Sequence, residues 1–184
     1  MDKIKLLYIH GLGSDKNSRK FIDLKAYFKD AFEYYCMEWK NEDNIDQMLV
    51  DIEALFNDDQ TLIVVGDSTG GNFAYQLKES RKKAGNETVL VLLNPLLNFS
   101  LRITSFVFPE NIKQYLDNIL EPEEAFILLG QYDEVLDHSY LDGYKGNKTV
   151  LFSVEDSHRI PKFQEYLPTI EMYIQTLLRN SVEE

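Results

Sequence analysis

Cysteine, histidine and long apolar runs are all scarce in this sequence of 184 residues. The single cysteine, Cys36, cannot form a disulfide within the chain, and its place in the apolar run at 33–37 favours a packed strand residue over a nucleophile. One cysteine and three scattered histidines also lack the ligand spacing of a metal site. We therefore expect neither a structural disulfide nor a bound metal.

The sequence also has few basic residues and no apolar run long enough to span a membrane. Its 19 basic residues face 31 acidic ones, so the net charge is −12, which repels nucleic-acid phosphates and anionic lipid surfaces. The longest apolar runs, at 62–65 and 89–93, are far below the roughly 20 residues that cross a bilayer. The apolar run near the N-terminus is too brief for a secretory signal. We expect no nucleic-acid partner, no membrane partner and a cytoplasmic location.

What is present is an ample core composition with alternating strand and helix patterns. Hydrophobic residues make up 44% of the chain, which suits one domain over residues 1–184. Apolar spacing predicts two helices over 43–56 and 69–83, and two more that begin at 17–18 and near Pro161. Pro168 is expected to kink or interrupt the last of these helices. Apolar runs predict strands at 4–9, 33–37, 61–65, 88–93, 125–129 and 148–154.

Continuous apolar strands separated by amphipathic helices indicate a parallel sheet that is covered on both faces. The predicted fold class is α/β, a three-layer α/β/α sandwich around a mainly parallel six-stranded sheet. One long irregular stretch, 94–124, interrupts the alternation and contains many apolar residues, with a short helix expected at 110–119. A stretch of this length in a compact protein is often functional.

The strongest chemical signal is a G-x-S-x-G motif, Gly66-Asp67-Ser68-Thr69-Gly70, directly after the apolar strand at 61–65. In a nucleophile elbow the serine lies on a strained turn between a strand and a helix, and small flanking residues prevent clashes. The start of the helix also directs N–H groups toward the reacting centre. The alternative is a turn in which Ser68 only caps the helix, but a cap does not require glycine on both sides.

A serine hydroxyl needs a base, which in this arrangement follows the serine and an acid along the chain. His158 follows the sixth expected strand and precedes the last helix, so we expect His158 to be the base. His10 comes before the serine and is better suited to ordering its own loop. His138 is five residues beyond Asp133 and would compete with that acid for its place.

The acid is expected to be Asp133, which follows the fifth strand, with Asp137 as the reserve candidate. Asp156 lies only two residues before His158, too close to reach the far nitrogen of the ring. An oxyanion hole needs preorganised donors. We expect these to be the backbone N–H groups of Thr69, after the nucleophile, and of Leu12, in the glycine-containing loop after the first strand.

With these segments the sequence resembles the α/β-hydrolases, and in particular the small YqiA-like bacterial esterases. The matching pieces run in order through nearly the whole chain: Tyr8-Ile9-His10-Gly11-Leu12-Gly13-Ser14, the elbow with Gly71, Leu93-Asn94-Pro95, Asp133-Glu134-Val135-Leu136-Asp137, and His158 before Phe163 and Pro168.

This resemblance implies a minimal α/β-hydrolase fold without the first two antiparallel strands. It also implies a Ser68–Asp133–His158 triad and hydrolysis of small carboxylic esters with short acyl chains, without a cofactor. The sequence departs from the family pattern at Arg159, where a small residue usually follows the base. This cation is expected to affect substrate preference and to lower the proton affinity of the histidine.

Several alternatives stay open at this stage. The stretch 94–124 is either a small lid that walls an acyl pocket or a cover for the edge of the sheet. Gly11-Leu12-Gly13 could begin a dinucleotide-binding turn, but Lys16 stands where the third glycine belongs. A non-catalytic binding protein with a hydrolase fold, an acyltransferase or a thioesterase would share much of the pattern. The oligomeric state is not predicted.

Overall fold

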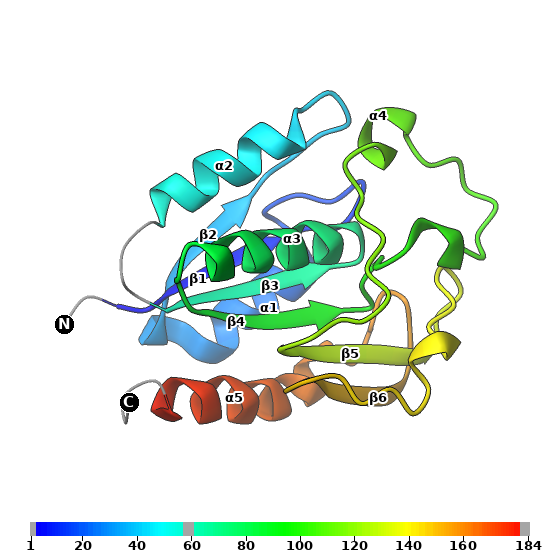
Figure 1. Cartoon of the computed structure of the whole chain (residues 1–184). Coiled ribbons are helices and arrows are strands. Elements are labelled where there is room, and N and C mark those ends of the chain that lie inside the picture. Colours follow the sequence, from blue (N-terminus) through cyan, green and yellow to red (C-terminus); the bar gives the residue numbers. More distant parts are fainter. Residues whose placement is uncertain (1–2, 57–60, 181–184) are drawn as a thin grey trace.

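A computed structural model describes residues 3–56 and 61–180, and its centre is an all-parallel sheet (Figure 1). The strand order is β2-β1-β3-β4-β5-β6. The fold class predicted from the sequence is confirmed, with the sheet entirely rather than mainly parallel. The strands are β1 (Lys5–Ile9), β2 (Glu33–Met37), β3 (Leu62–Asp67), β4 (Thr88–Leu93), β5 (Ala125–Tyr132) and β6 (Val150–Ser157).

Helices cover both faces of this sheet. Apolar residues of α1 (Arg19–Phe28) and α5 (Phe163–Asn180) pack on one face, and those of α2 (Ile45–Leu55) and α3 (Thr69–Lys83) pack on the other. Shorter helices lie in the connections: α4 (Glu110–Lys113), η1 (Lys29–Ala31), η2 (Phe99–Leu101) and η3 (Ser139–Leu141). No helix in the described part of the chain is long and apolar enough to cross a membrane.

The period-two alternation of strand side chains explains how one apolar strand serves two cores. In β1, Leu7 and Ile9 join the cluster under α2 and α3, while Leu6 and Tyr8 join the cluster under α1 and α5. All four residues are almost fully buried. A strand that is covered on both faces needs an apolar residue at every position, and this is the continuous pattern read from the sequence.

The ends of some elements differ from the sequence predictions. Strands β5 and β6 each extend three residues beyond their expected ends, to Tyr132 and Ser157. The expected interruption at Pro168 does not occur, because α5 continues through it. Pro168 is the sixth residue of α5, so the missing N–H removes only one helical hydrogen bond near the helix start. Asn44 caps α2 as expected, accepting from the N–H of Gln47 at 3.1 Å.

The long stretch 94–124 is divided between core and surface. Phe108, Ile112 and Ile119 are buried in the cluster beneath α2 and α3, so part of the stretch closes the core. Phe106 and Val107 are 72% and 84% exposed. The helix expected over 110–119 is limited to the four residues of α4, and the chain then continues to β5 without regular structure.

Candidate active site

Ser68 lies on a sharp turn between β3 and α3. Its φ of 52° and ψ of −117° are a conformation that L-residues rarely adopt, as expected for a strained elbow. Close packing explains the glycine two residues after Ser68, because a Cβ at Gly70 would collide with the carbonyl groups of Ile9 and His10. The elbow therefore packs directly against the end of β1.

Three side chains from distant parts of the chain form one hydrogen-bonded series at this turn. The Oγ of Ser68 lies 2.9 Å from Nε2 of His158, and Nδ1 of the same ring lies 2.8 Å from Oδ2 of Asp133. A neutral ring that donates from Nδ1 to the carboxylate leaves Nε2 free to accept the serine proton. All three residues lie at the carboxyl end of the sheet, because each follows the end of β3, β5 or β6.

The loop around Asp133 holds its carboxylate in place. Oδ1 accepts the backbone N–H groups of Val135 and Leu136 at 2.8 and 2.9 Å, which leaves Oδ2 for His158. Burial raises the pKa of this carboxyl, but the hydrogen bond and charge of His158 and the two N–H groups lower it more. The net pKa lies below its ordinary value, so Asp133 is ionised at neutral pH.

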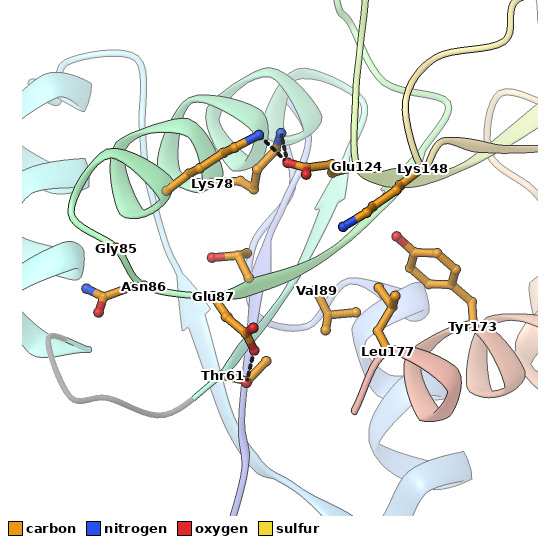
Figure 2. A pocket seen from close by; sticks show the side chains of 12 residues that line it. Thr61, Lys78, Gly85, Asn86, Glu87, Val89, Glu124, Lys148, Tyr173 and Leu177 are labelled. Atoms are coloured by element: carbon orange, nitrogen blue, oxygen red, sulfur yellow. Dashed lines mark hydrogen bonds and ion pairs between the residues drawn. The ribbon is translucent and has the colours of Figure 1, made fainter. Parts of the chain in front are cut away.

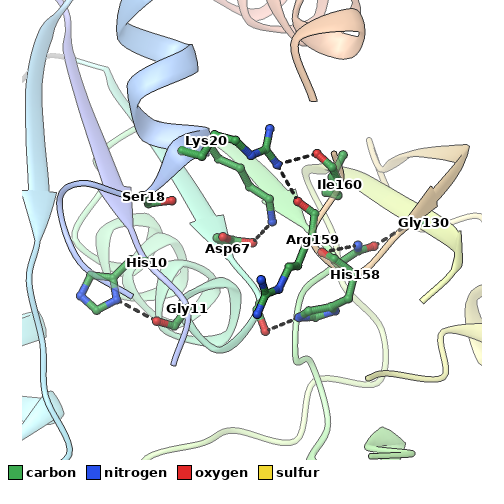
Figure 3. A network of polar contacts seen from close by, with 12 residues as sticks. His10, Gly11, Ser18, Lys20, Asp67, Gly130, His158, Arg159 and Ile160 are labelled. Carbon is green, nitrogen blue, oxygen red and sulfur yellow. Dashed lines mark hydrogen bonds and ion pairs between the residues drawn. The ribbon is translucent and has the colours of Figure 1, made fainter. Parts of the chain in front are cut away.

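His10 orders the loop after β1. Its Nε2 accepts the N–H of Trp39 at 3.1 Å, which fixes the neutral ring with its proton on Nδ1, and Nδ1–H donates to the carbonyl of Gly11 at 2.8 Å (Figure 3). The indole of Trp39 stacks on this ring and donates to the His10 carbonyl. Burial lowers the pKa of His10. The ring is thus a fixed support in this loop.

The two expected oxyanion donors lie on the segments that adjoin Ser68. Thr69 is the first residue of α3 and follows Ser68 directly. Leu12 follows Gly11, and a Cβ at Gly11 would stand only 3.2 Å from the Cβ of Ser68. The glycine thus lets the loop after β1 approach the serine closely. The donor roles themselves remain predictions.

The remaining candidates from the sequence lie near the site in other roles. Asp137 accepts from the N–H of Ser139, and Asp156 accepts from the N–H groups of Ser157 and Lys162. His138 is buried beside the acid: its Nε2 is 3.0 Å from the carbonyl of Pro95 and its Nδ1 is 3.8 Å from Oδ2 of Asp133. His138 therefore lies next to the carboxylate of Asp133, and it takes no part in the hydrogen bond between Ser68 and His158.

Two supporting residues were not identified from the sequence as parts of the site. Asn94, directly after β4, accepts the N–H of Gly130 in β5 and donates to the carbonyl groups of Ser157 and His158 at the end of β6, so it connects the carboxyl ends of three neighbouring strands. Glu134 accepts the backbone N–H of His158 at 3.1 Å. These contacts join segments that are far apart in sequence, and only the position of Asn94 directly after a strand could have indicated such a role.

A cavity of about 330 Å³ lies elsewhere, at the opposite end of the sheet (Figure 2). Its lining includes Thr88 and Val89 at the start of β4, with Lys78 and Lys82 of α3 and Tyr173 of α5. The parallel strands begin at this end, whereas Ser68 follows the carboxyl end of β3. This cavity therefore cannot hold a group that reacts with the serine.

No protein-family model matches the sequence, and no curated protein matches it either. Solved structures do match. A protein from Agrobacterium vitis S4 that carries the name hydrolase is 15% identical with a TM-score of 0.74. The match covers 94% of this chain and 88% of that protein's chain. An arylesterase is 13% identical with a TM-score of 0.68, covering 92% and 75%.

A further match is BorB, a type II thioesterase from the borrelidin biosynthetic cluster. It is 12% identical with a TM-score of 0.66, covering 94% of this chain and 92% of its own. At these identities the likeness concerns the fold, and the narrower resemblance to YqiA-like esterases stays a prediction. This chain has an α/β-hydrolase-like fold.

Proposed function

We propose that this protein is a serine hydrolase that cleaves small carboxylic esters through Ser68, His158 and Asp133. The single observation that carries the proposal is the continuous hydrogen-bonded series from Ser68 Oγ through the imidazole to Asp133, built on a strained elbow. A buried, ionised carboxylate behind a histidine stabilises the imidazolium that forms when the serine gives up its proton. Structural neighbours that include an arylesterase support the same class.

The reaction would proceed in two halves. Ser68 Oγ attacks the ester carbonyl while its proton passes to Nε2 of His158, and the N–H groups of Thr69 and Leu12 stabilise the oxyanion. The tetrahedral intermediate then expels the alcohol, which takes the proton from His158. Water attacks the acyl-enzyme with His158 again as the base, releasing the carboxylic acid and the free serine.

The stretch 94–124 would form one wall of the acyl pocket. Backbone contacts join it to the loop of the acid. The N–H of Ile103 donates to the carbonyl of Val135, and the backbone of Arg102 forms an isolated antiparallel β-bridge with that of Leu136. The two most exposed large apolar residues of the stretch, Phe106 and Val107, would be available for an apolar substrate. The alternative, that the stretch only covers the edge of the sheet, accounts for the buried Phe108 but not for these two exposed residues.

Thioester cleavage is the second candidate function, favoured by the similarity to the thioesterase BorB. The same residues could also transfer the acyl group to another acceptor, and a non-catalytic binding protein would need none of this chemistry.

A panel of p-nitrophenyl esters from acetate to decanoate, with matched acyl thioesters, tests these alternatives. We expect ester hydrolysis that is fastest with short chains and that falls at least about 1,000-fold in Ser68→Ala. Preference for thioesters would select the second candidate. Equal rates for wild type and Ser68→Ala would contradict both.

A further inference from the structure

The contact between Ser68 and His158 joins two strands that are not neighbours. Ser68 follows β3 and His158 follows β6, and β4 and β5 lie between them in the sheet. Strand pairing therefore does not hold these two loops together directly. A hydrogen bond of 2.9 Å between their side chains depends on how each loop is fixed at the carboxyl end of the sheet.

The loop that carries His158 contains a strained residue. Ile160 has a φ of 49° and is fully buried. A β-branched residue at positive φ is rare, and such a conformation persists only where its surroundings impose it. The turn is closed by a hydrogen bond from the N–H of Ile160 to the carbonyl of Ser157 at 3.0 Å. Further contacts must hold the loop in this shape.

Arg19, at the start of α1, supplies these contacts. Its Nη2 donates to the carbonyl groups of Arg159 and Ile160 at 2.8 and 2.7 Å, and both of these acceptor residues are labelled in Figure 3. Its Nη1 approaches the carbonyl of Pro161 at 3.4 Å. Nη1 also pairs with Asp23 at 3.2 Å, one turn further along the helix. A planar guanidinium can serve several carbonyls at once, which a lysine ammonium on a flexible stem does less well.

The next residue of the same helix contacts the residue that precedes the nucleophile. Lys20 Nζ lies 2.6 Å from Oδ1 of Asp67, the residue before Ser68, and both side chains are nearly buried. Tyr8 donates its hydroxyl hydrogen to the other oxygen of Asp67 at 3.1 Å. The two adjacent side chains at the start of α1 therefore contact the loop of the base and the elbow of the nucleophile, respectively.

We propose that Arg19 is a positioning residue for His158, and that the first turn of α1, through Arg19 and Lys20, holds the base and the nucleophile in register. This inference rests on the proposed function. Arg19 does not touch the reacting atoms, so its loss changes the alignment of the base and leaves the acyl site intact. Because small misplacements of catalytic groups are costly, Arg19→Ala should lower kcat about 10- to 100-fold with little change in KM.

The test compares Arg19→Ala and Arg19→Lys with Arg179→Ala, a matched control at an exposed arginine in the last turn of α5. Steady-state ester hydrolysis is measured with and without ethylguanidinium, added at concentrations that do not unfold the protein. The added cation should restore part of the kcat of Arg19→Ala and leave Arg179→Ala unchanged. Arg19→Lys should fall between wild type and Arg19→Ala, because lysine cannot span the carbonyls.

Two outcomes would overturn the inference. One is wild-type kcat in Arg19→Ala. The other is a lower kcat that ethylguanidinium does not raise and that follows the unfolded fraction measured by circular dichroism, since this marks a purely structural role. The proposed function is tested separately by the wild type and Ser68→Ala. If those two differ and Arg19→Ala equals wild type, the serine chemistry stands and only the positioning role fails.

Discussion

At the scale of single residues, the account depends on which carboxylate supports His158. The structure places the two candidate aspartates, Asp133 and Asp137, in different surroundings. Asp133 is 2.8 Å from the imidazole, whereas Asp137 is exposed and bound to the backbone N–H of Ser139. The distinction follows from the turn after β5, in which the N–H groups of Val135 and Leu136 orient one carboxylate inward.

Asp133→Asn should therefore lower kcat by about four orders of magnitude, because an amide that donates to Nδ1 stabilises the wrong tautomer of the histidine. Asp137→Asn is the matched control and should keep nearly full activity. Steady-state kinetics on the best ester of the panel measure both. Similar losses in the two variants, or a loss only in Asp137→Asn, would contradict the assignment.

The supporting residues show what the sequence could not reveal at this scale. Ser68, Asp133 and His158, whose side chains the structure brings within hydrogen-bond distance, could be predicted because each stands after an apolar strand in a fixed chain order. Asn94, Glu134 and Arg19 could not, because their contacts depend on how loops from separate strands meet in space. A hydrogen bond from a side chain to a distant carbonyl leaves no periodic trace in the sequence.

At the scale of elements, the strands were the most readable part of the chain. A strand covered on both faces must be apolar at every position, so its presence is explicit in the sequence, although its polar ends are not. Gln131, Tyr132 and Ser157 still belong to β5 and β6, and none of them continues the buried pattern. The helix predicted at 110–119 is present only over Glu110–Lys113, because packing of Ile112 and Ile119 into the core does not require helical backbone between them.

The stretch 94–124 carries the prediction that belongs to this scale. Replacing Phe106 and Val107 together with serine should shift the preferred acyl length in the ester panel, because both side chains are exposed and neither closes the core. Met172→Ser, at another exposed apolar residue on α5, is the control and should leave the preference unchanged. Thermal unfolding should change little in all variants. An unaltered chain-length profile would favour a purely structural stretch.

At the scale of the whole molecule, two buried histidines link stability to pH. Burial lowers the pKa of His10 and of His138 from the ordinary value of 6.5. Above pH 6.5 both are neutral in the folded and the unfolded chain, so their stabilising effect is complete. As the pH falls below 6.5, the unfolded chain binds protons first, and the free energy of unfolding decreases until the folded-state pKa is passed.

Urea unfolding at pH 7.5 and at pH 5.5 measures this effect. Wild type should be less stable at pH 5.5, with each histidine contributing at most about 1.4 kcal/mol per pH unit. In His138→Gln the difference between the two pH values should be smaller, because one of the two groups no longer titrates. An identical difference in wild type and variant would contradict burial of a neutral His138.

The proposed function requires Ser68 to be an activated nucleophile, which covalent labelling with a fluorophosphonate probe, followed by intact-mass and peptide analysis, measures. We expect one phosphonyl group per chain, located on Ser68 and absent in Ser68→Ala, with slower labelling in His158→Ala. Labelling of Ser68→Ala to the same extent as wild type, or no labelling of the folded wild type, would contradict it.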